Sequence, residues 1–350
     1  MRNKIFNINL FVRPSIKALK PYSSARDEFK SAKTDLVFLD ANENPFENGV
    51  NRYPDSQQVN LKKGLSNLKG INTKNILLGN GSDEILDLIL RAFCEPNQDN
   101  VIILPPTYGM YEVLARINNI EIIKIKLTNS FQPNSNLILN SINENSKVLF
   151  LCSPNNPTAN SFDKSKIETL IRGFAGVVII DEAYIDFSDK ESWLTRLKEF
   201  PNLIITQTLS KAYGMAGIRL GICYASTEII SVLDKIKPPY NVNTLTQQRA
   251  IEQLLSPSSV HTQIDTILEE RDKLFKGIKS IEFINKVYPT DSNFILLKVD
   301  DANKRYHQLI KKGIVVRNIT NQPLCNNCIR ITVGTKEENK KLLKALKKIQ

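Results

Sequence analysis

Short runs of apolar, mostly β-branched residues recur along this 350-residue chain and alternate with segments of helical periodicity. One such helical segment is Ile85–Phe93, whose apolar side chains fall on a single face just before the first run. Strands that are apolar on both faces and alternate with helices are typical of a mostly parallel sheet that is covered on both sides. We therefore predict an α/β fold with a doubly wound sheet, whose strands include residues 101–104, 122–127, 148–152, 177–180 and 203–206.

A change of pattern near residue 240 indicates a second domain. Pro238 and Pro239 interrupt the alternation, and a long charged helix is predicted through the 250s to 270s. Beyond it we expect strands at 294–299, 315–317 and 329–333 and a helix over 302–311. We predict an N-terminal arm at 1–35 that packs with the small domain, a large domain at 36–242, and a smaller α+β C-terminal domain at 243–350.

The chain is basic, with a formal net charge of +11. Its densest cluster of lysines, residues 336–348, leaves two readings open, nucleic-acid binding and the solvated face of a helix. Leu342, Leu343, Leu346 and Ile349 form one apolar stripe there, so we favour the helix and expect no nucleic-acid partner. No apolar run approaches the ~18 residues of a membrane span, so we expect no membrane association.

Five cysteines and the lack of a recognisable signal peptide indicate a reducing compartment, and we expect a cytoplasmic protein. Cys325 and Cys328 form an isolated CxxC pair. A zinc site would need two further ligands at matching spacing, and the two histidines of the chain, His261 and His307, are far apart in the sequence. We expect no metal.

Polar residues follow four of the predicted strands at the point where each ends. They are Gly79–Asp83 after Leu78, Ser153–Thr158 after Cys152, Asp181–Tyr184 after Ile180, and Thr208–Lys211 after Thr206. Functional groups in open α/β sheets gather at the carboxyl ends of the strands. Each segment alone has an ordinary explanation as a turn, a helix cap or a surface lysine. Four together predict one site.

The chemistry of these residues suits pyridoxal 5'-phosphate. Lys211 offers an amine that can bind the cofactor aldehyde covalently, and Asp181 offers an anion for the ring nitrogen. Asn156 and Tyr184 offer donors for the ring oxygen. The phosphate would be bound at a helix start and by a hydroxyl and a guanidinium; we assign these roles to Gly81, Ser82, Asp83, Ser210 and Arg219.

Four motifs occur in an order that resembles the class II, fold type I pyridoxal-phosphate-dependent aminotransferases. They are Gly-Asn-Gly-Ser-Asp-Glu (79–84), Asn-Asn-Pro-Thr (155–158), Asp-Glu-Ala-Tyr (181–184) and the segment 210–221. The resemblance extends from about residue 21 to residue 334. Finer pieces are similar to the histidinol-phosphate aminotransferase branch of that family: residues 21–22, 40–45, 52–55 and 329–334. One departure is Ala159, where the family usually has glycine.

The resemblance implies a homodimer in which Tyr53 reaches the cofactor phosphate of the neighbouring subunit, and a Tyr108 ring above the cofactor ring. It also implies that Arg330 binds the anionic group of the substrate, helped by Arg317. One planar guanidinium can bind a phosphate or a carboxylate, so it can serve both half-reactions. Lys211, Asp181 and Tyr184 would be catalytic, and Tyr22 and Asn156 would also contact the substrate.

The implied activity is transamination of L-histidinol phosphate with 2-oxoglutarate to imidazole-acetol phosphate and L-glutamate, in histidine biosynthesis. Two other enzymatic functions stay open at this point. One is an aminotransferase for aromatic or other amino acids, and the other is a threonine-phosphate decarboxylase. A transcription regulator with a borrowed aminotransferase domain would need an added DNA-binding module, for which we expect no room before the first motif.

Overall fold

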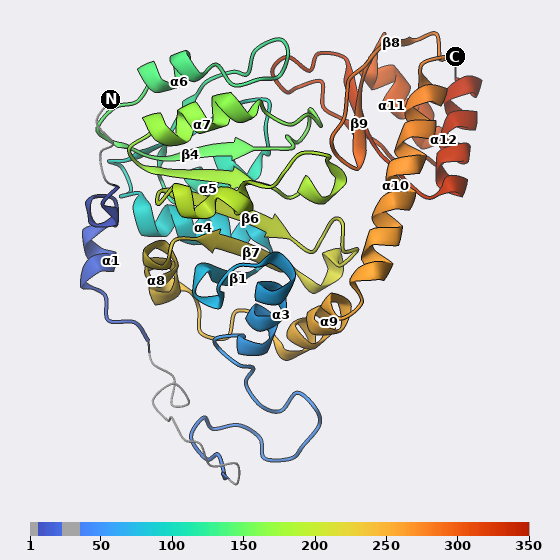
Figure 1. Ribbon diagram of the computed structural model, residues 1–350. Coiled ribbons are helices and arrows are strands. Elements are labelled where there is room, and N and C mark those ends of the chain that lie inside the picture. The colour runs from blue at the N-terminus through green and yellow to red at the C-terminus, as the bar shows by residue number, and fades with distance from the viewer. Residues whose placement is uncertain (1–5, 23–35, 350) are drawn as a thin grey trace.

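The computed structural model describes residues 6–22 and 36–349 and contains two sheets (Figure 1). The larger has seven strands in the order β1-β7-β6-β5-β4-β2-β3. Five neighbouring strands are parallel, whereas β7 runs antiparallel to both of its neighbours. The bounds are β1 (Ile76–Asn80), β2 (Asn100–Ile103), β3 (Glu121–Lys124), β4 (Ser146–Cys152), β5 (Val177–Asp181), β6 (Leu203–Thr208) and β7 (Leu220–Ala225).

The five apolar runs predicted as strands are confirmed as β2 to β6. The predicted strand at 122–127 is longer than the observed one, because β3 ends at Lys124. Strand β7 was not predicted. It begins at Leu220, within the last two residues of the motif that ends at Gly221, and every one of its residues is buried.

Helices cover both faces of the large sheet because strand side chains alternate between two apolar cores. Leu149 and Leu151 point into one core, and Val148 and Phe150 point into the other. The first core is closed by α3 (Val59–Lys69), α6 (Ser135–Asn140), α7 (Lys164–Gly173) and the 3-10 helix η4 (Trp193–Glu199). The second is closed by α4 (Ser82–Phe93), α5 (Met110–Ile117) and α8 (Thr227–Ile236). The predicted doubly wound α/β architecture is confirmed.

The smaller sheet is antiparallel, with the order β10-β11-β9-β8. Its strands are β8 (Ile284–Val287), β9 (Phe294–Val299), β10 (Arg317–Asn318) and β11 (Cys328–Thr332). Its core includes side chains of α10 (Pro257–Ile278), α11 (Ala302–Lys311) and α12 (Lys336–Lys348). The terminal lysine-rich stretch is thus α12, which buries Leu342 and Leu346 and begins with a capping box of Thr335 and Glu338.

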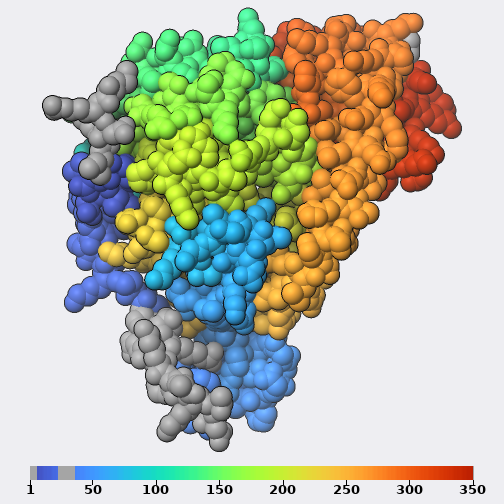
Figure 2. Space-filling view, in the orientation of Figure 1, coloured from blue at the N-terminus to red at the C-terminus, as the bar shows by residue number. Residues whose placement is uncertain are grey.

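Helix α10 runs along the edge of the molecule from the large domain to the small one (Figures 1 and 2). It has 22 residues and is buried along one face, at Val260, Ile264, Glu270, Leu274 and Ile278. None of the helices in the described part of the chain is long and apolar enough to cross a membrane.

The helix before it, α9 (Thr244–Leu254), packs against α3 of the large domain. The domain boundary at residue 243 therefore stays a prediction, and this packing favours a boundary closer to the start of α10.

The described part of the N-terminal arm, residues 6–22, packs on the large domain and not on the small one as predicted. Within the described residues 6–22, Val12 is buried in the core beneath α4, and α1 (Pro14–Ala18) contacts α8. Arg13 forms an ion pair of 3.1 Å with Glu95. The arm packs on the large domain because its apolar side chains complete the core on that face. Its remaining residues, 1–5 and 23–35, lie outside the described parts of the chain.

Cys325 and Cys328 are both buried, and the backbone N–H of Cys328 donates to the carbonyl of Cys325 at 3.0 Å. They therefore flank a tight turn, in which Asn327 has a φ of 53°. Nowhere in the described residues do three or more His, Cys, Asp or Glu side chains come together as a metal site would require.

Candidate active site

One pocket lies at the carboxyl ends of β4, β5 and β6. These strands are parallel neighbours, so the residues that end them meet at one edge of the sheet. Cys152 pairs in register with Asp181, and Asp181 pairs with Thr206. The pocket is lined by Ser82, Asp83, Tyr108, Cys152, Asn156, Asp181, Ala183, Tyr184, Thr208, Ser210, Lys211 and Arg219. Nine of these twelve were assigned to the site from the sequence.

Asp181, the last residue of β5, is only 4% exposed. The hydroxyl of Tyr111 donates to its Oδ2 at 2.7 Å, and the backbone N–H of Ala183 donates to Oδ1 at 3.1 Å. Burial raises the pKa of the Asp181 carboxyl, and these hydrogen bonds oppose that rise. Within the described residues it forms no ion pair. A buried carboxylate of this kind is suited to a cationic ligand atom.

Lys211 follows β6, and its Nζ lies 5.8 Å from the centre of the Tyr184 ring. The pKa of this amine is lowered, first by desolvation in the pocket and then by the positive charges of Arg330 and Arg219. A lowered pKa increases the share of unprotonated amine near neutral pH, which is the form that attacks a carbonyl group. The role of Lys211 as the residue that binds the cofactor stays a prediction, and the lowered pKa of its amine favours it.

Helix α4 begins at the mouth of the pocket. Gly81, its N-cap, has a φ of 80°, and no side chain caps the first N–H groups, which are available to an anion. The backbone is tightly packed here, since a Cβ on Gly221 would lie 2.4 Å from the Ser82 nitrogen. A Cβ on Gly81 would lie 2.7 Å from the Arg219 guanidinium. The site therefore needs glycine at both positions.

The carboxylate of Asp83 faces two other pocket residues. It accepts a hydrogen bond from the Tyr108 hydroxyl at 3.0 Å and lies 3.8 Å from the Arg219 guanidinium. A carboxylate repels a phosphate, so Asp83 could bind one only through its backbone N–H. Its side chain instead orients Tyr108 and Arg219.

Arg330 lies at the edge of the pocket, on β11 of the small domain. Its guanidinium donates a hydrogen bond to the side-chain oxygen of Asn156 and lies 5.1 Å from the centre of the Phe294 ring. Burial lowers its pKa. Arg317 is the cross-strand partner of Arg330 on β10 and is exposed. The two arginines therefore lie next to each other on neighbouring strands, and their joint action on one anion stays a prediction.

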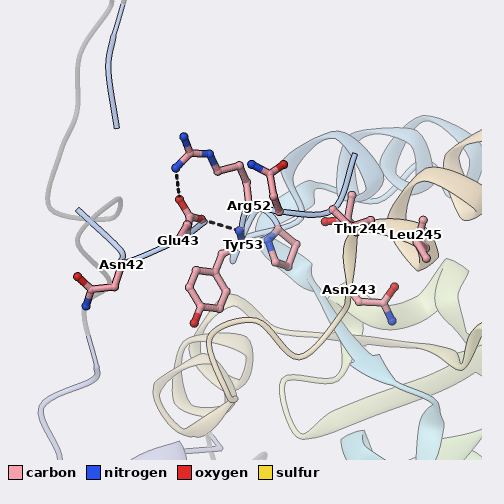
Figure 3. Close-up of a pocket in the computed structure, with 10 residues that line it drawn as sticks. Asn42, Glu43, Arg52, Tyr53, Asn243, Thr244 and Leu245 are labelled. Carbon is pink, nitrogen blue, oxygen red and sulfur yellow. Dashed lines mark hydrogen bonds and ion pairs between the residues drawn. The ribbon is translucent and has the colours of Figure 1, made fainter. Parts of the chain in front are cut away.

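Besides Gly81, Arg317 and Arg330, two further predicted site residues do not line this pocket. Tyr22 is 73% exposed, and Tyr53 is 49% exposed with its ring stacked on Tyr240 at 4.5 Å. Tyr53 borders a separate hollow, shown in Figure 3, where Glu43 pairs with Arg52 at 2.8 Å and accepts from the Tyr53 N–H at 2.6 Å. The roles given to Tyr22 and Tyr53 stay predictions.

Tyr111 is a neighbour of the pocket that cannot be recognised from the sequence. It is fully buried, and its hydroxyl donates to the Asp181 carboxylate. It follows Tyr108 by three positions, so the two rings meet on one side of the chain at the start of α5, with centroids 5.5 Å apart. That spacing was the one available signal, and nothing local in the sequence pairs Tyr111 with Asp181.

Ala159 takes the left-handed conformation that usually favours glycine, with a φ of 69°. Its methyl is buried in a small cluster with Tyr184, Phe187 and Phe294. A backbone hydrogen bond holds this loop, because the Ala159 carbonyl accepts from the Asp291 N–H at 2.8 Å. The conformation costs about 1–2 kcal/mol for a residue with a Cβ, and the bonded loop holds it in place.

A doubly wound sheet with a lysine, a buried aspartate and a helix N-terminus at one edge defines an aminotransferase-like site. The family model for aminotransferase class I and II matches residues 31–346. The chain belongs to this family.

Individual relatives agree with that assignment. A histidinol-phosphate aminotransferase of Flavobacterium johnsoniae is 62% identical over 98% of both chains. The crystal structure of the histidinol-phosphate aminotransferase from Clostridium acetobutylicum has a TM-score of 0.79 and 26% identity, over 86% of this chain and 91% of that one. The Sinorhizobium meliloti enzyme in complex with pyridoxal-5'-phosphate shares the fold, with a TM-score of 0.78 and 23% identity over 85% and 83%.

Proposed function

We propose that this protein transaminates L-histidinol phosphate with 2-oxoglutarate, giving imidazole-acetol phosphate and L-glutamate in histidine biosynthesis. The reaction type rests above all on one arrangement, in which Lys211 and Asp181 border a single pocket with Arg330 at its edge. The choice of substrate rests on the F. johnsoniae relative, which carries that name at 62% identity.

The cofactor in this proposal is pyridoxal 5'-phosphate, and the pocket fits its three kinds of polar group. The backbone N–H groups at the start of α4, with Ser210 and Arg219, would hold the phosphate. Asp181 would hold the ring nitrogen as a cation, and Lys211 would bind the aldehyde carbon. When bound, the cofactor supplies a carrier for the amino group and a protonated ring that withdraws electrons.

The other residues would orient the ligands and move a proton. Tyr108, fixed by Asp83, would cover the cofactor ring. Asn156 has its side-chain oxygen bonded to Arg330, which leaves its NH₂ group to donate to the ring oxygen beside Tyr184. Lys211, whose pKa is lowered, is the base suited to take a proton from the substrate carbon that bears the amino group.

Arg330 would bind the anionic group of either substrate. Histidinol phosphate offers a phosphate and glutamate a carboxylate, and a guanidinium binds each with two parallel hydrogen bonds. The exposed Arg317 beside it would add a second positive charge for the larger phosphate anion. Tyr22 would contact the substrate as well.

We also propose a homodimer in the cytoplasm, with Tyr53 completing the site of the partner. The segment before α3 projects from the body of the molecule and exposes large apolar side chains (Figures 1 and 2). Tyr53 lies on this segment and does not line the Lys211 pocket of its own chain. A second copy would bury this surface.

The test is an assay of purified protein with L-histidinol phosphate and 2-oxoglutarate, followed by detection of L-glutamate. Aromatic amino acids and threonine phosphate serve as competing substrates in parallel reactions. We expect glutamate to form fastest from histidinol phosphate and only when 2-oxoglutarate is present. Carbon dioxide release from threonine phosphate would favour the decarboxylase, and faster turnover of an aromatic amino acid would favour the broader aminotransferase.

A further inference from the structure

The Asp181 carboxylate accepts a hydrogen bond from Tyr111, a residue to which no role in the site has been assigned. The Tyr111 hydroxyl donates to its Oδ2 at 2.7 Å, at the short end of the range for such bonds. The same carboxylate is the proposed partner of the cofactor ring nitrogen. Tyr111 therefore shares the lone pairs of Asp181 with whatever cation binds there.

Two ring contacts and one hydrogen bond hold Tyr111 in place. It is fully buried, and its ring stacks on Phe150 of β4 at 4.6 Å with an interplanar angle of 14°. The rings of Tyr111 and Tyr108 meet in a T-shaped contact, with their centroids 5.5 Å apart and an interplanar angle of 86°. Burial and the nearby Asp181 raise the pKa of the Tyr111 hydroxyl well above its usual value, so it remains a hydrogen-bond donor across the physiological range.

We propose that Tyr111 is a positioning residue that decides where the proton lies between Asp181 and the ring nitrogen of the cofactor. This inference rests on the proposed function. A hydrogen bond to a carboxylate stabilises its charged form and makes it a weaker base. With Tyr111 bonded, Asp181 stays ionised although it is buried, and the proton stays on the ring nitrogen. Without that bond, the carboxylate competes more strongly for the same proton.

Tyr111 also sets the ring of Tyr108, which is proposed to cover the cofactor. Tyr108 is held at its hydroxyl by Asp83 and at its ring by the edge contact with Tyr111. One buried side chain thus contacts both Asp181, which would hold the ring nitrogen, and Tyr108, which would cover the cofactor ring.

The experiment compares Tyr111→Phe with a matched control, Tyr224→Phe. Tyr224 is also fully buried, and its hydroxyl has no hydrogen-bond partner in the described structure. Each substitution removes one buried hydroxyl and keeps the ring. Each variant is loaded with pyridoxal phosphate that carries ¹⁵N in the ring, and the ¹⁵N NMR shift is measured at fixed pH.

In Tyr111→Phe we expect the nitrogen signal to move toward that of unprotonated pyridine, while Tyr224→Phe keeps the wild-type shift. We also expect kcat to fall roughly tenfold or more, the effect of one hydrogen bond to a charged group, with little change in KM. A wild-type nitrogen shift in Tyr111→Phe would overturn the inference.

Two further measurements separate the other causes of failure. If the wild-type protein does not bind the labelled cofactor, the proposed function fails, independently of Tyr111. If Tyr111→Phe loses stability, a double-mutant cycle with Asp181→Asn decides the matter. The effect of Tyr111→Phe on kcat should vanish in the Asp181→Asn background, whereas a merely structural role would leave it unchanged and refute the inference.

Discussion

The guanidinium of Arg330 donates a hydrogen bond to the side-chain oxygen of Asn156, and this contact joins β11 of the small domain to the loop after β4. It brings the proposed substrate-anion residue next to a proposed cofactor residue. It also fixes the orientation of the Asn156 amide, because the oxygen is engaged and the NH₂ group must face the pocket. The position of the small domain therefore contributes directly to the site.

Arg330→Lys keeps the positive charge but loses the planar pair of donors. We expect a loss of about 1.5–3 kcal/mol per charged hydrogen bond, or roughly 10- to 100-fold in kcat/KM, for both amino substrates. Single-turnover kinetics with histidinol phosphate and with glutamate measure the two half-reactions separately, and the absorbance of the bound cofactor should stay normal. Sparing of the histidinol phosphate half-reaction would contradict a shared anion site.

Arg317→Ala should weaken the phosphate substrate more than glutamate. Arg317 is exposed, so solvent screens its charge and we expect a modest effect, about 1 kcal/mol or less. The measurement is kcat/KM for histidinol phosphate divided by kcat/KM for glutamate. At low ionic strength this ratio should be lower in Arg317→Ala than in the wild type, and at high salt it should return to the wild-type value. An equal change in kcat/KM for both substrates would show that Arg317 has no special role in binding the phosphate.

Lys211 should be the residue that carries the cofactor. Borohydride reduction of the loaded protein followed by peptide mapping should find the pyridoxyl group on Lys211, which is the lysine that lines the pocket. Lys211→Ala should abolish turnover and leave no reducible adduct. Lys69→Ala is the control, because Lys69 does not line the pocket. Its Nζ forms an ion pair with Asp186 at 3.5 Å. A label on another lysine would end this assignment.

Asp181→Asn should retain the cofactor but lose activity. Ser210, Arg219 and the start of α4 still hold the phosphate, so we expect the dissociation constant of pyridoxal phosphate to rise modestly. The neutral amide no longer stabilises a protonated ring, and kcat should fall at least about 100-fold. Equilibrium dialysis and steady-state kinetics test the two parts. Near-normal turnover would show that another acid has this role.

The rate of cofactor incorporation into the cofactor-free protein should depend on pH through Lys211. Its pKa lies below the usual value, so the reactive amine appears at lower pH than for a solvated lysine. Arg330→Gln removes one of the positive charges that lower this pKa. The pKa should therefore rise, and the pH midpoint of incorporation should move upward.

Arg317→Gln provides the control for that experiment, because its charge is exposed to solvent. Its midpoint should stay near that of the wild type. Stopped-flow absorbance across a pH series gives both midpoints. A downward shift in Arg330→Gln would show that the guanidinium does not control the Lys211 amine.

The amino-acid sequence by itself determined the five parallel strands of the large sheet and most of the pocket. Buried strands are local features, since four or five consecutive apolar residues leave few other structures for such a segment. Once these strands are parallel, their carboxyl ends must share one edge. Asn156, Asp181 and Lys211 therefore meet for a reason that can be read from the chain, and the pocket contains all three.

Tertiary structure alone decided the contacts between distant segments. The sequence suggested an arm packed on the small domain, whereas Val12 and Arg13 bind the large one. It gave no sign that Tyr111 would donate to Asp181, because that bond depends on how the start of α5 packs on the sheet, where Tyr111 stacks on Phe150 of β4. Apolar patterning specifies which face of an element is buried, but the partner of each buried polar group is selected only when the elements have packed together.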